Sequence, residues 1–148
     1  MSGVPNLYVV ETVESKKLAT KLNAACTSEG RETPLSVCVQ VNTSGEISKS
    51  GCQPDECLDL VRHVVEECDR LRFRGLMTIG RYGDTTTECF ERLRSCRDRV
   101  LKSVELPDEV VEDFELSMGM SGDFESAIAC GSTSIRVGSK IFGAREYK

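Results

Sequence analysis

The chain has 148 residues, 39% hydrophobic and 29% charged, with a formal net charge of −5 and a pI near 5.0. That size and composition predict one globular domain with an ordinary hydrophobic core. The acidic balance argues against nucleic-acid binding, which needs a clustered basic face. No apolar run approaches the ~18 residues of a membrane span, and the N-terminus lacks the regions of a secretory signal.

Eight cysteines and one histidine, His63, are the residues from which disulfides or a metal site would be built. The cysteines form no C-x-x-C pair, so the paired short spacings of a structural zinc site are missing. Disulfides are typical of exported proteins, and no export signal is recognised here. We therefore expect a cytoplasmic protein with reduced, mostly buried thiols and no bound metal.

In the first half of the chain, apolar runs alternate with helical patterns. Residues 7–10 (LYVV) and 35–41 (LSVCVQV) are expected strands, and a helix with Leu18, Leu22 and Ala25 on one face lies between them. A polar loop, 42–51, follows. A helix then opens at Pro54, whose missing N–H does no harm in a first turn. Its expected buried stripe is Cys57, Leu58, Val61, Val65 and Cys68.

The second half continues the alternation. Residues 71–79 are the next expected strand, and Thr85 with Glu88 fits a capping box at the start of a helix. Pro107 ends that helix. Strands near 113–118 and 133–142, with a short helix near 122–130 between them, complete the chain. The apolar stripe of the long helix is Phe90, Leu93, Cys96 and Val100.

Strands that alternate with helices predict an α/β fold with a parallel sheet. An eight-unit (β/α)8 barrel normally needs ~250 residues. Five units therefore match five eighths of such a barrel, about strands 4 to 8. An open, doubly wound sheet is the competing architecture, but no G-x-G-x-x-G follows the first strand, where that fold usually binds phosphate.

Small residues follow each of the last two expected strands: Gly119, Ser121 and Gly122 after one, Gly138 and Ser139 after the other. The loops after strands 7 and 8 of an α/β barrel often bind phosphate. Ser121 either caps the next helix or donates to a phosphate at the same helix terminus. Asp123 and Glu125 in that first turn would weaken anion binding somewhat.

Arg136 lies inside an apolar strand, so its guanidinium either points outward beneath a helix or faces inward with a partner, since an unpaired buried charge is costly. The inward orientation would offer a fixed cation to a heterocycle or an acidic group. Met77, Met118 and Met120 are core candidates, although Met120 could pack against a flat ring. Lys49 and Lys140 are the lysines nearest the strand ends, and neither context indicates an activated amine.

Four ordered blocks, 39–51, 71–84, 115–128 and 131–147, resemble the pyridoxal 5′-phosphate (PLP) homeostasis protein family. Residues 5–19 match its pattern as well, so the resemblance covers nearly the whole chain. It implies a barrel similar to the N-terminal domain of alanine racemase and a non-catalytic, cytoplasmic PLP-binding protein, with a mitochondrial pool for a full-length parent. The resemblance also implies that Arg136 faces the pyridine nitrogen, that Ser121, Gly138 and Ser139 hold the phosphate, and that Met77 and Met120 lie near the ring.

The departures from the family pattern set a further expectation. In the family, a lysine at the end of the first strand holds PLP as a Schiff base, and no lysine in this sequence matches it. Residues 1–148 would form a single partial barrel domain that begins near strand 4. Lys140 stands where the family often has a small residue.

We therefore expect PLP binding that is noncovalent at best, and weak or lost. Exposed sheet edges are expected to favour self-association. Two alternatives stay open: a fragment of a PLP-dependent amino-acid racemase, and an interaction fragment that modulates the full-length protein.

Overall fold

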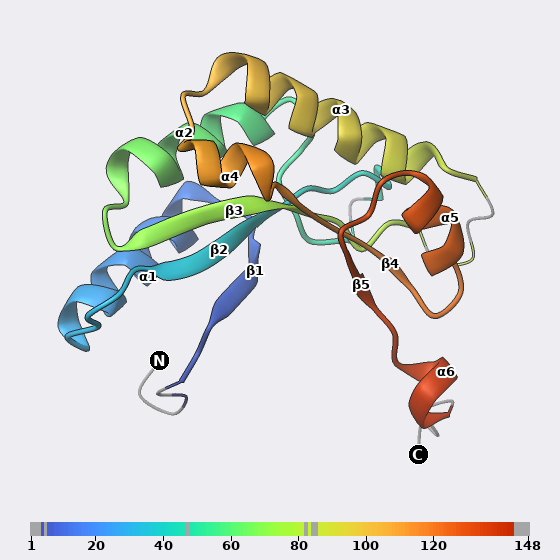
Figure 1. Cartoon of the computed structure of the whole chain (residues 1–148), viewed down its shortest axis with the longest axis horizontal. Helices are drawn as coiled ribbons and strands as arrows, with labels where there is room; N and C mark the ends of the chain where they lie inside the picture. Colours follow the sequence, from blue (N-terminus) through green and yellow to red (C-terminus); the bar gives the residue numbers. More distant parts are fainter. Residues whose placement is uncertain (1–3, 5, 47, 82, 84–85, 144–148) are drawn as a thin grey trace.

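A computed structural model describes residues 4, 6–46, 48–81, 83 and 86–143. Its centre is a parallel sheet of five strands in the order β1-β2-β3-β4-β5, with every neighbouring pair parallel (Figure 1). The strands are β1 (Val9–Val13), β2 (Leu35–Gln40), β3 (Leu71–Met77), β4 (Glu115–Met120) and β5 (Ser134–Arg136). The helices are α1 (Lys16–Ser28), α2 (Cys57–Glu67), α3 (Glu88–Ser103), α4 (Asp108–Glu112), α5 (Phe124–Ala129) and α6 (Ser139–Phe142).

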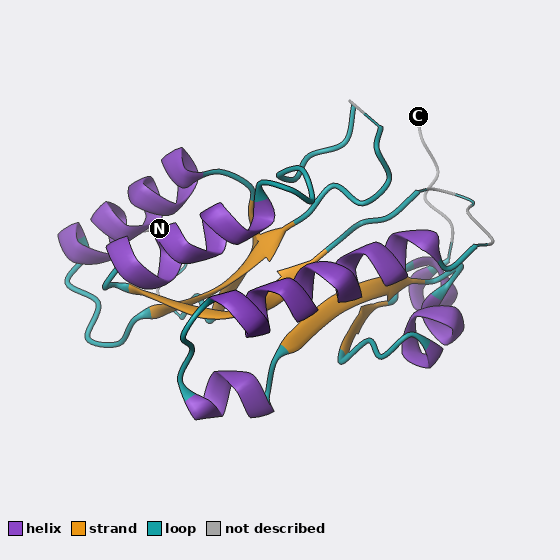
Figure 2. Ribbon diagram, turned by 90° about the horizontal axis from the view of Figure 1, so that it is seen from above, coloured by secondary structure: helices purple, strands orange, loops and turns teal. Residues whose placement is uncertain are grey.

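The sheet curls into a half-barrel, with β1 and β5 at its two margins (Figure 1). The large helices cover the convex face, as the view from above also shows (Figure 2). The strictly sequential strand order is that of a (β/α)8 barrel, whereas a doubly wound sheet reverses its order at a switch point. The predicted α/β fold with an incomplete barrel sheet is confirmed.

The hydrophobic core lies between the convex face and the helices. Val37, Phe73, Leu76 and Leu116 pack there against helix residues such as Leu93, and Phe73 meets Phe114 edge-to-face at 5.7 Å between ring centroids. All eight cysteines are buried thiols, as the sequence predicts. Within the described residues, no helix combines the length and apolar character required to cross a lipid bilayer.

The predicted strand at 133–142 is wrong beyond Arg136. Residues 139–142 instead form α6, because the backbone turns at Gly138 and its carbonyl accepts the N–H groups of Ile141 and Phe142 at 2.9 Å each. Apolar residues in this segment suggested a strand, but Ile141 and Phe142 are exposed. The first strand also differs, since β1 occupies Val9–Val13 and not 7–10.

Helix boundaries differ from the prediction in three places. Helix α2 begins at Cys57, after a turn that includes Pro54, and it buries Leu60 and Val64 where Leu58 and Val65 were expected. Thr85 of the predicted capping box lies outside the described residues, and the residue before α3 is Thr87. Pro107 ends the segment as predicted, but the short helix α4 that it starts was missed.

Candidate functional site

The loops after β4 and β5 meet at Ser121. Its Oγ accepts hydrogen bonds from the backbone N–H groups of Gly138, at 3.0 Å, and Lys140, at 3.3 Å. The expectation that Ser121 caps the next helix is wrong: α5 begins at Phe124, and Asp123 precedes it. The Asp123 carboxylate accepts from the N–H of Met120 at 2.6 Å, so it is already engaged within its own loop.

Arg136, the last residue of β5, points toward neighbouring strands. Its Nη1 donates to Ser117 Oγ at 2.6 Å, and its Nη2 donates to the Thr78 carbonyl at 2.7 Å. Both contacts run across the sheet, toward the ends of β4 and β3, so the alternative of an outward arginine beneath a helix is wrong. Burial lowers the Arg136 pKa, opposed by the charges of Glu11 and Asp123. The guanidinium is thus a fixed cation at the carboxyl ends of the strands.

Sequence patterns alone did not identify Glu11. Ser117 Oγ donates to its carboxylate at 2.7 Å, which links β1 to β4 and, through Ser117, to Arg136. Cys38 of β2 belongs to the same electrostatic environment: burial raises the pKa of its thiol, and the nearby charges of Glu115 and Glu11 raise it further. Strand alternation identifies which face a residue takes, but nothing local in the sequence pairs Glu11 with a residue 106 positions away.

The two methionines and Ser139 lie around this centre. Met77 is in register with Ser117 across β3 and β4, and Met120 is in register with Arg136 across β4 and β5. Met77 is buried, while Met120 is partly exposed. Ser139 begins α6 directly after Gly138. The strand ends therefore bring Ser121, Gly138, Ser139, Arg136, Met77 and Met120 to one end of the half-barrel sheet.

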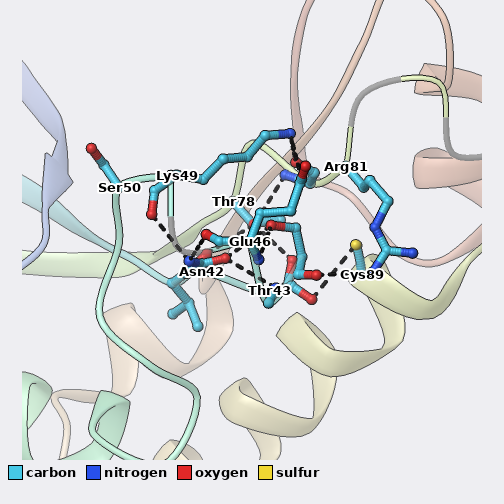
Figure 3. Close-up of polar contacts among 12 residues, drawn as sticks. Asn42, Thr43, Glu46, Lys49, Ser50, Thr78, Arg81 and Cys89 are labelled. Atoms are coloured by element: carbon cyan, nitrogen blue, oxygen red, sulfur yellow. Dashed lines mark hydrogen bonds and ion pairs between the residues drawn. The ribbon is translucent and has the colours of Figure 1, made fainter.

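A second polar cluster occupies the ends of β2 and β3 and the loop 42–51 (Figure 3). The Asn42 side chain fixes the loop by donating to the carbonyls of Glu46 at 2.9 Å and Lys49 at 3.0 Å. Lys49 Nζ donates to the Gly80 carbonyl at 2.8 Å and pairs with Glu46 at 3.0 Å. Hydrogen bonds thus tie the described part of this loop, residues 42–46 and 48–51, together beside Thr78, whose carbonyl holds Arg136.

The donor set fits PLP by its chemistry. Phosphate oxygens accept hydrogen bonds from groups such as a serine hydroxyl and the backbone N–H groups around Gly138 and Ser139. A ring nitrogen accepts from a donor such as a guanidinium. Asp123, the nearest carboxylate in that loop, is already engaged by the Met120 N–H. Lys140 Nζ lies over the Phe124 ring at 4.5 Å from its centroid.

A parallel half-barrel with sequential strand order defines an α/β-barrel domain of the alanine racemase type. The alanine racemase N-terminal domain family matches residues 3–146, and the chain belongs to that family. It is 45% identical over 151 aligned positions to the pyridoxal phosphate homeostasis protein of Homo sapiens, covering 99% of this chain and 54% of that protein. The predicted likeness to such proteins is confirmed, and the chain spans about half the length of the curated relatives it matches.

Solved structures agree with the fold. PipY of Synechococcus elongatus, determined with PLP bound, superposes with a TM-score of 0.73 at 29% identity, covering 91% of this chain and 60% of PipY. Alanine racemase of Clostridium difficile superposes with a TM-score of 0.63 at 18% identity, covering 93% of this chain and 34% of the enzyme. The second likeness establishes a shared fold and carries no information on activity.

Proposed function

We propose that this chain binds PLP noncovalently and takes part in intracellular PLP homeostasis without catalysing a reaction. The observation that carries the proposal is the meeting of Ser121 with the N–H groups of Gly138 and Lys140, next to the fixed guanidinium of Arg136. Likeness to pyridoxal phosphate homeostasis proteins and to PLP-bound PipY supports the same ligand.

In this proposal, the phosphate is held by Ser121, Gly138 and Ser139. Hydrogen bonds from a serine hydroxyl and from backbone N–H groups replace those that water makes to the free phosphate. Arg136 donates to the ring nitrogen, and Met77 and Met120 pack near the ring. An arginine stays protonated and is only a donor, so it favours an unprotonated ring nitrogen. When bound, PLP supplies an electron-withdrawing ring.

The contacts of the lysines nearest the strand ends support noncovalent binding. The Lys49 amine is held by the Gly80 carbonyl and Glu46, and the Lys140 amine lies over Phe124. An amine engaged by such partners is a poor nucleophile. Racemase chemistry would also need an opposing acid–base group, and Tyr8 is 68% exposed with its hydroxyl 2.5 Å from Arg74 Nη1. Tyr82 and Tyr147 lie outside the described residues.

Equilibrium dialysis of the chain against PLP tests the proposal. We expect saturable binding of one PLP per chain, and inorganic phosphate should compete with it. Pyridoxal, which lacks the phosphate, should bind much more weakly. Binding of pyridoxal and PLP with equal affinity would contradict the proposal.

We further propose that the chain, as a single partial barrel domain, associates with itself through β1 and β5, the margins of the sheet. Unpaired strand edges are templates for pairing with another chain. Sedimentation analysis over a range of concentrations should show an average mass that rises with concentration, and a constant monomer mass would contradict this. Co-purification with a longer family member would favour the interaction-fragment alternative.

A further inference from the structure

A pocket of about 600 Å³ opens at the amino ends of the strands, whereas Arg136 and Ser121 lie at their carboxyl ends. Its walls come from the segments that lead into β1 and β2, from the first residues of β2 and β3, and from α4 with the residue that ends it. In α/β barrels the active site lies at the carboxyl ends of the strands, and the amino ends serve stability. The pocket is therefore separate from the site proposed for PLP.

Arg31 brings to this pocket a positive charge that lacks an acidic partner. Two other arginines line the pocket, and each forms an ion pair, at 2.9 Å and 3.1 Å: Arg72 with Glu109, and Arg74 with Glu115. Arg31 is half-buried, and no carboxylate of the described residues lies within ion-pair distance of it. The charge of Arg31 is thus the one that the pocket leaves for a ligand.

The Arg31 side chain is held in place and still has donors to spare. Its Nη2 donates to the Leu7 carbonyl at 3.1 Å, and Arg70 Nη2 donates to the carbonyl of Arg31 itself. The Nε atoms of Arg31 and Arg70 are buried, and neither has a hydrogen-bond partner within the described part of the chain. Since buried donors are nearly always paired, these atoms point to a partner outside the chain. Water can pair with an N–H, but only an anion also neutralises the charge.

Ser36 adds a hydroxyl to the same pocket. It lines the pocket, its exposed fraction is only 7%, and its hydroxyl makes no hydrogen bond to any other residue that the structure describes. In the sheet it is in register with Val9 of β1 and Arg72 of β3, so the strands on both sides fix its position. Because a buried hydroxyl without a partner costs free energy, an oxygen of a bound ligand is the partner that this position favours.

Two carboxylates also line the pocket, and they limit the charge of its ligand. Glu109 is neutralised by Arg72, and Asp113 is exposed, where water and salt screen its charge. They leave the surroundings of Arg31 positive but oppose a ligand that carries many charges. The pocket is consequently suited to a single phosphate or carboxylate group and not to a polyanion such as a nucleic acid.

We propose that this pocket is a second binding site, for the oxyanion group of a small molecule, with Arg31 as its cation and Ser36 as its neutral donor. A guanidinium is the side chain best matched to phosphate and carboxylate oxygens, because its N–H donors form a planar fork. Arg31 already connects the loop before β2 to Leu7, which precedes β1. An anion bound here therefore also strengthens the attachment of β1, the strand at one margin of the sheet.

Protection of Arg31 from phenylglyoxal tests the proposal. The whole 148-residue chain is treated with this arginine reagent at constant ionic strength and rising inorganic phosphate or acetate, and mass spectrometry quantifies each modified arginine. We expect saturable, several-fold protection of Arg31: by phosphate alone for a phosphate site, by acetate for a carboxylate site. Phosphate bound near Ser121 does not register, because the reaction is followed at Arg31. Arg94, exposed on α3 and outside the pocket, is the internal control. Protection by neither anion, or equal protection of Arg94, would overturn the proposal.

Variants test the two contacts separately. Ser36→Ala should raise the anion concentration that half-protects Arg31 about 5-fold, the loss expected for one neutral hydrogen bond, whereas Ser28→Ala, at the exposed end of α1, should not change it. An anion that binds the folded chain also raises the melting temperature. This rise should be smaller in Arg31→Gln than in Arg94→Gln, and equal rises would overturn the assignment of Arg31. The protection measured on the unmodified chain decides the proposal by itself if a variant does not fold.

Discussion

Arg136 donates to Ser117 at 2.6 Å, and this bond joins β5 to β4 across the end of the sheet. Ser117 in turn donates to Glu11 of β1, so one hydroxyl connects a cation and a carboxylate from opposite margins of the sheet. The guanidinium is held on two sides, by Ser117 and by the Thr78 carbonyl. A group held this way presents its remaining N–H bonds in one direction, which is what recognition of a ring nitrogen requires.

Replacing Arg136 tests the ring contact. Arg136→Gln removes a charged hydrogen bond worth about 1.5–3 kcal/mol, so affinity for PLP should fall about 10- to 150-fold. Arg72→Gln is the control, because Arg72 is also a strand arginine but pairs with Glu109 at the surface. Dialysis of both variants against PLP checks the prediction. If the two lose affinity equally, Arg136 does not contact the ligand.

Ser121→Ala tests the phosphate contact. The hydroxyl is a neutral partner worth about 1 kcal/mol, so PLP affinity should fall roughly 5-fold. Because the effect acts through the phosphate, weak binding of pyridoxal should be unchanged. Ser126→Ala, in the exposed part of α5, should leave both ligands unaffected. An equal loss for PLP and pyridoxal would mean that Ser121 acts on folding and not on the phosphate.

Gly119 is a position where a side chain has no room. Its φ is +98°, and a Cβ would lie 2.6 Å from Ala127 Cβ and 3.1 Å from Phe124 Cα. Backbone strain and overpacking together predict a loss of about 2–5 kcal/mol in the free energy of unfolding for Gly119→Ala. Gly122→Ala is the matched control, since nothing lies within 4 Å of its Cβ. Urea denaturation of both variants should separate them clearly, and similar midpoints would refute the close packing of β4 against α5.

Glu46 gives the polar loop a pH dependence. Its hydrogen bond with Lys49 lowers the pKa of the carboxyl below the ordinary value. A folded-state pKa below the unfolded one stabilises the fold at pH values above the unfolded pKa, and this contribution is lost as the pH falls through the folded pKa. Glu46→Gln should therefore lower the melting temperature at neutral pH, and the difference from the unmodified chain should vanish well below pH ~4.3. A difference that persists in acid would contradict this role.

The sequence was sufficient for the features that repeat along the chain. Alternating strand and helix patterns predict the parallel sheet, and the small residues after β4 and β5 predict the place where two loops meet. The local sequence pattern gave the wrong structure at α6, because the apolar residues Ile141 and Phe142 are typical of a strand. The helical turn there depends on hydrogen bonds that the pattern does not reveal: the Gly138 carbonyl accepts from Ile141 and Phe142, and the Ser121 hydroxyl accepts from the Gly138 N–H. Glu11 was missed for a similar reason, since its partner Ser117 is brought to it only by closure of the sheet.

Borohydride reduction in the presence of PLP tests the central claim most directly. The chain is incubated with PLP, divided into reduced and unreduced samples, dialysed and digested. We predict that binding of PLP before dialysis is saturable and that dialysis removes all PLP from the unreduced sample. In the reduced sample, no lysine should carry a stoichiometric adduct. One lysine modified in every molecule would contradict the claim.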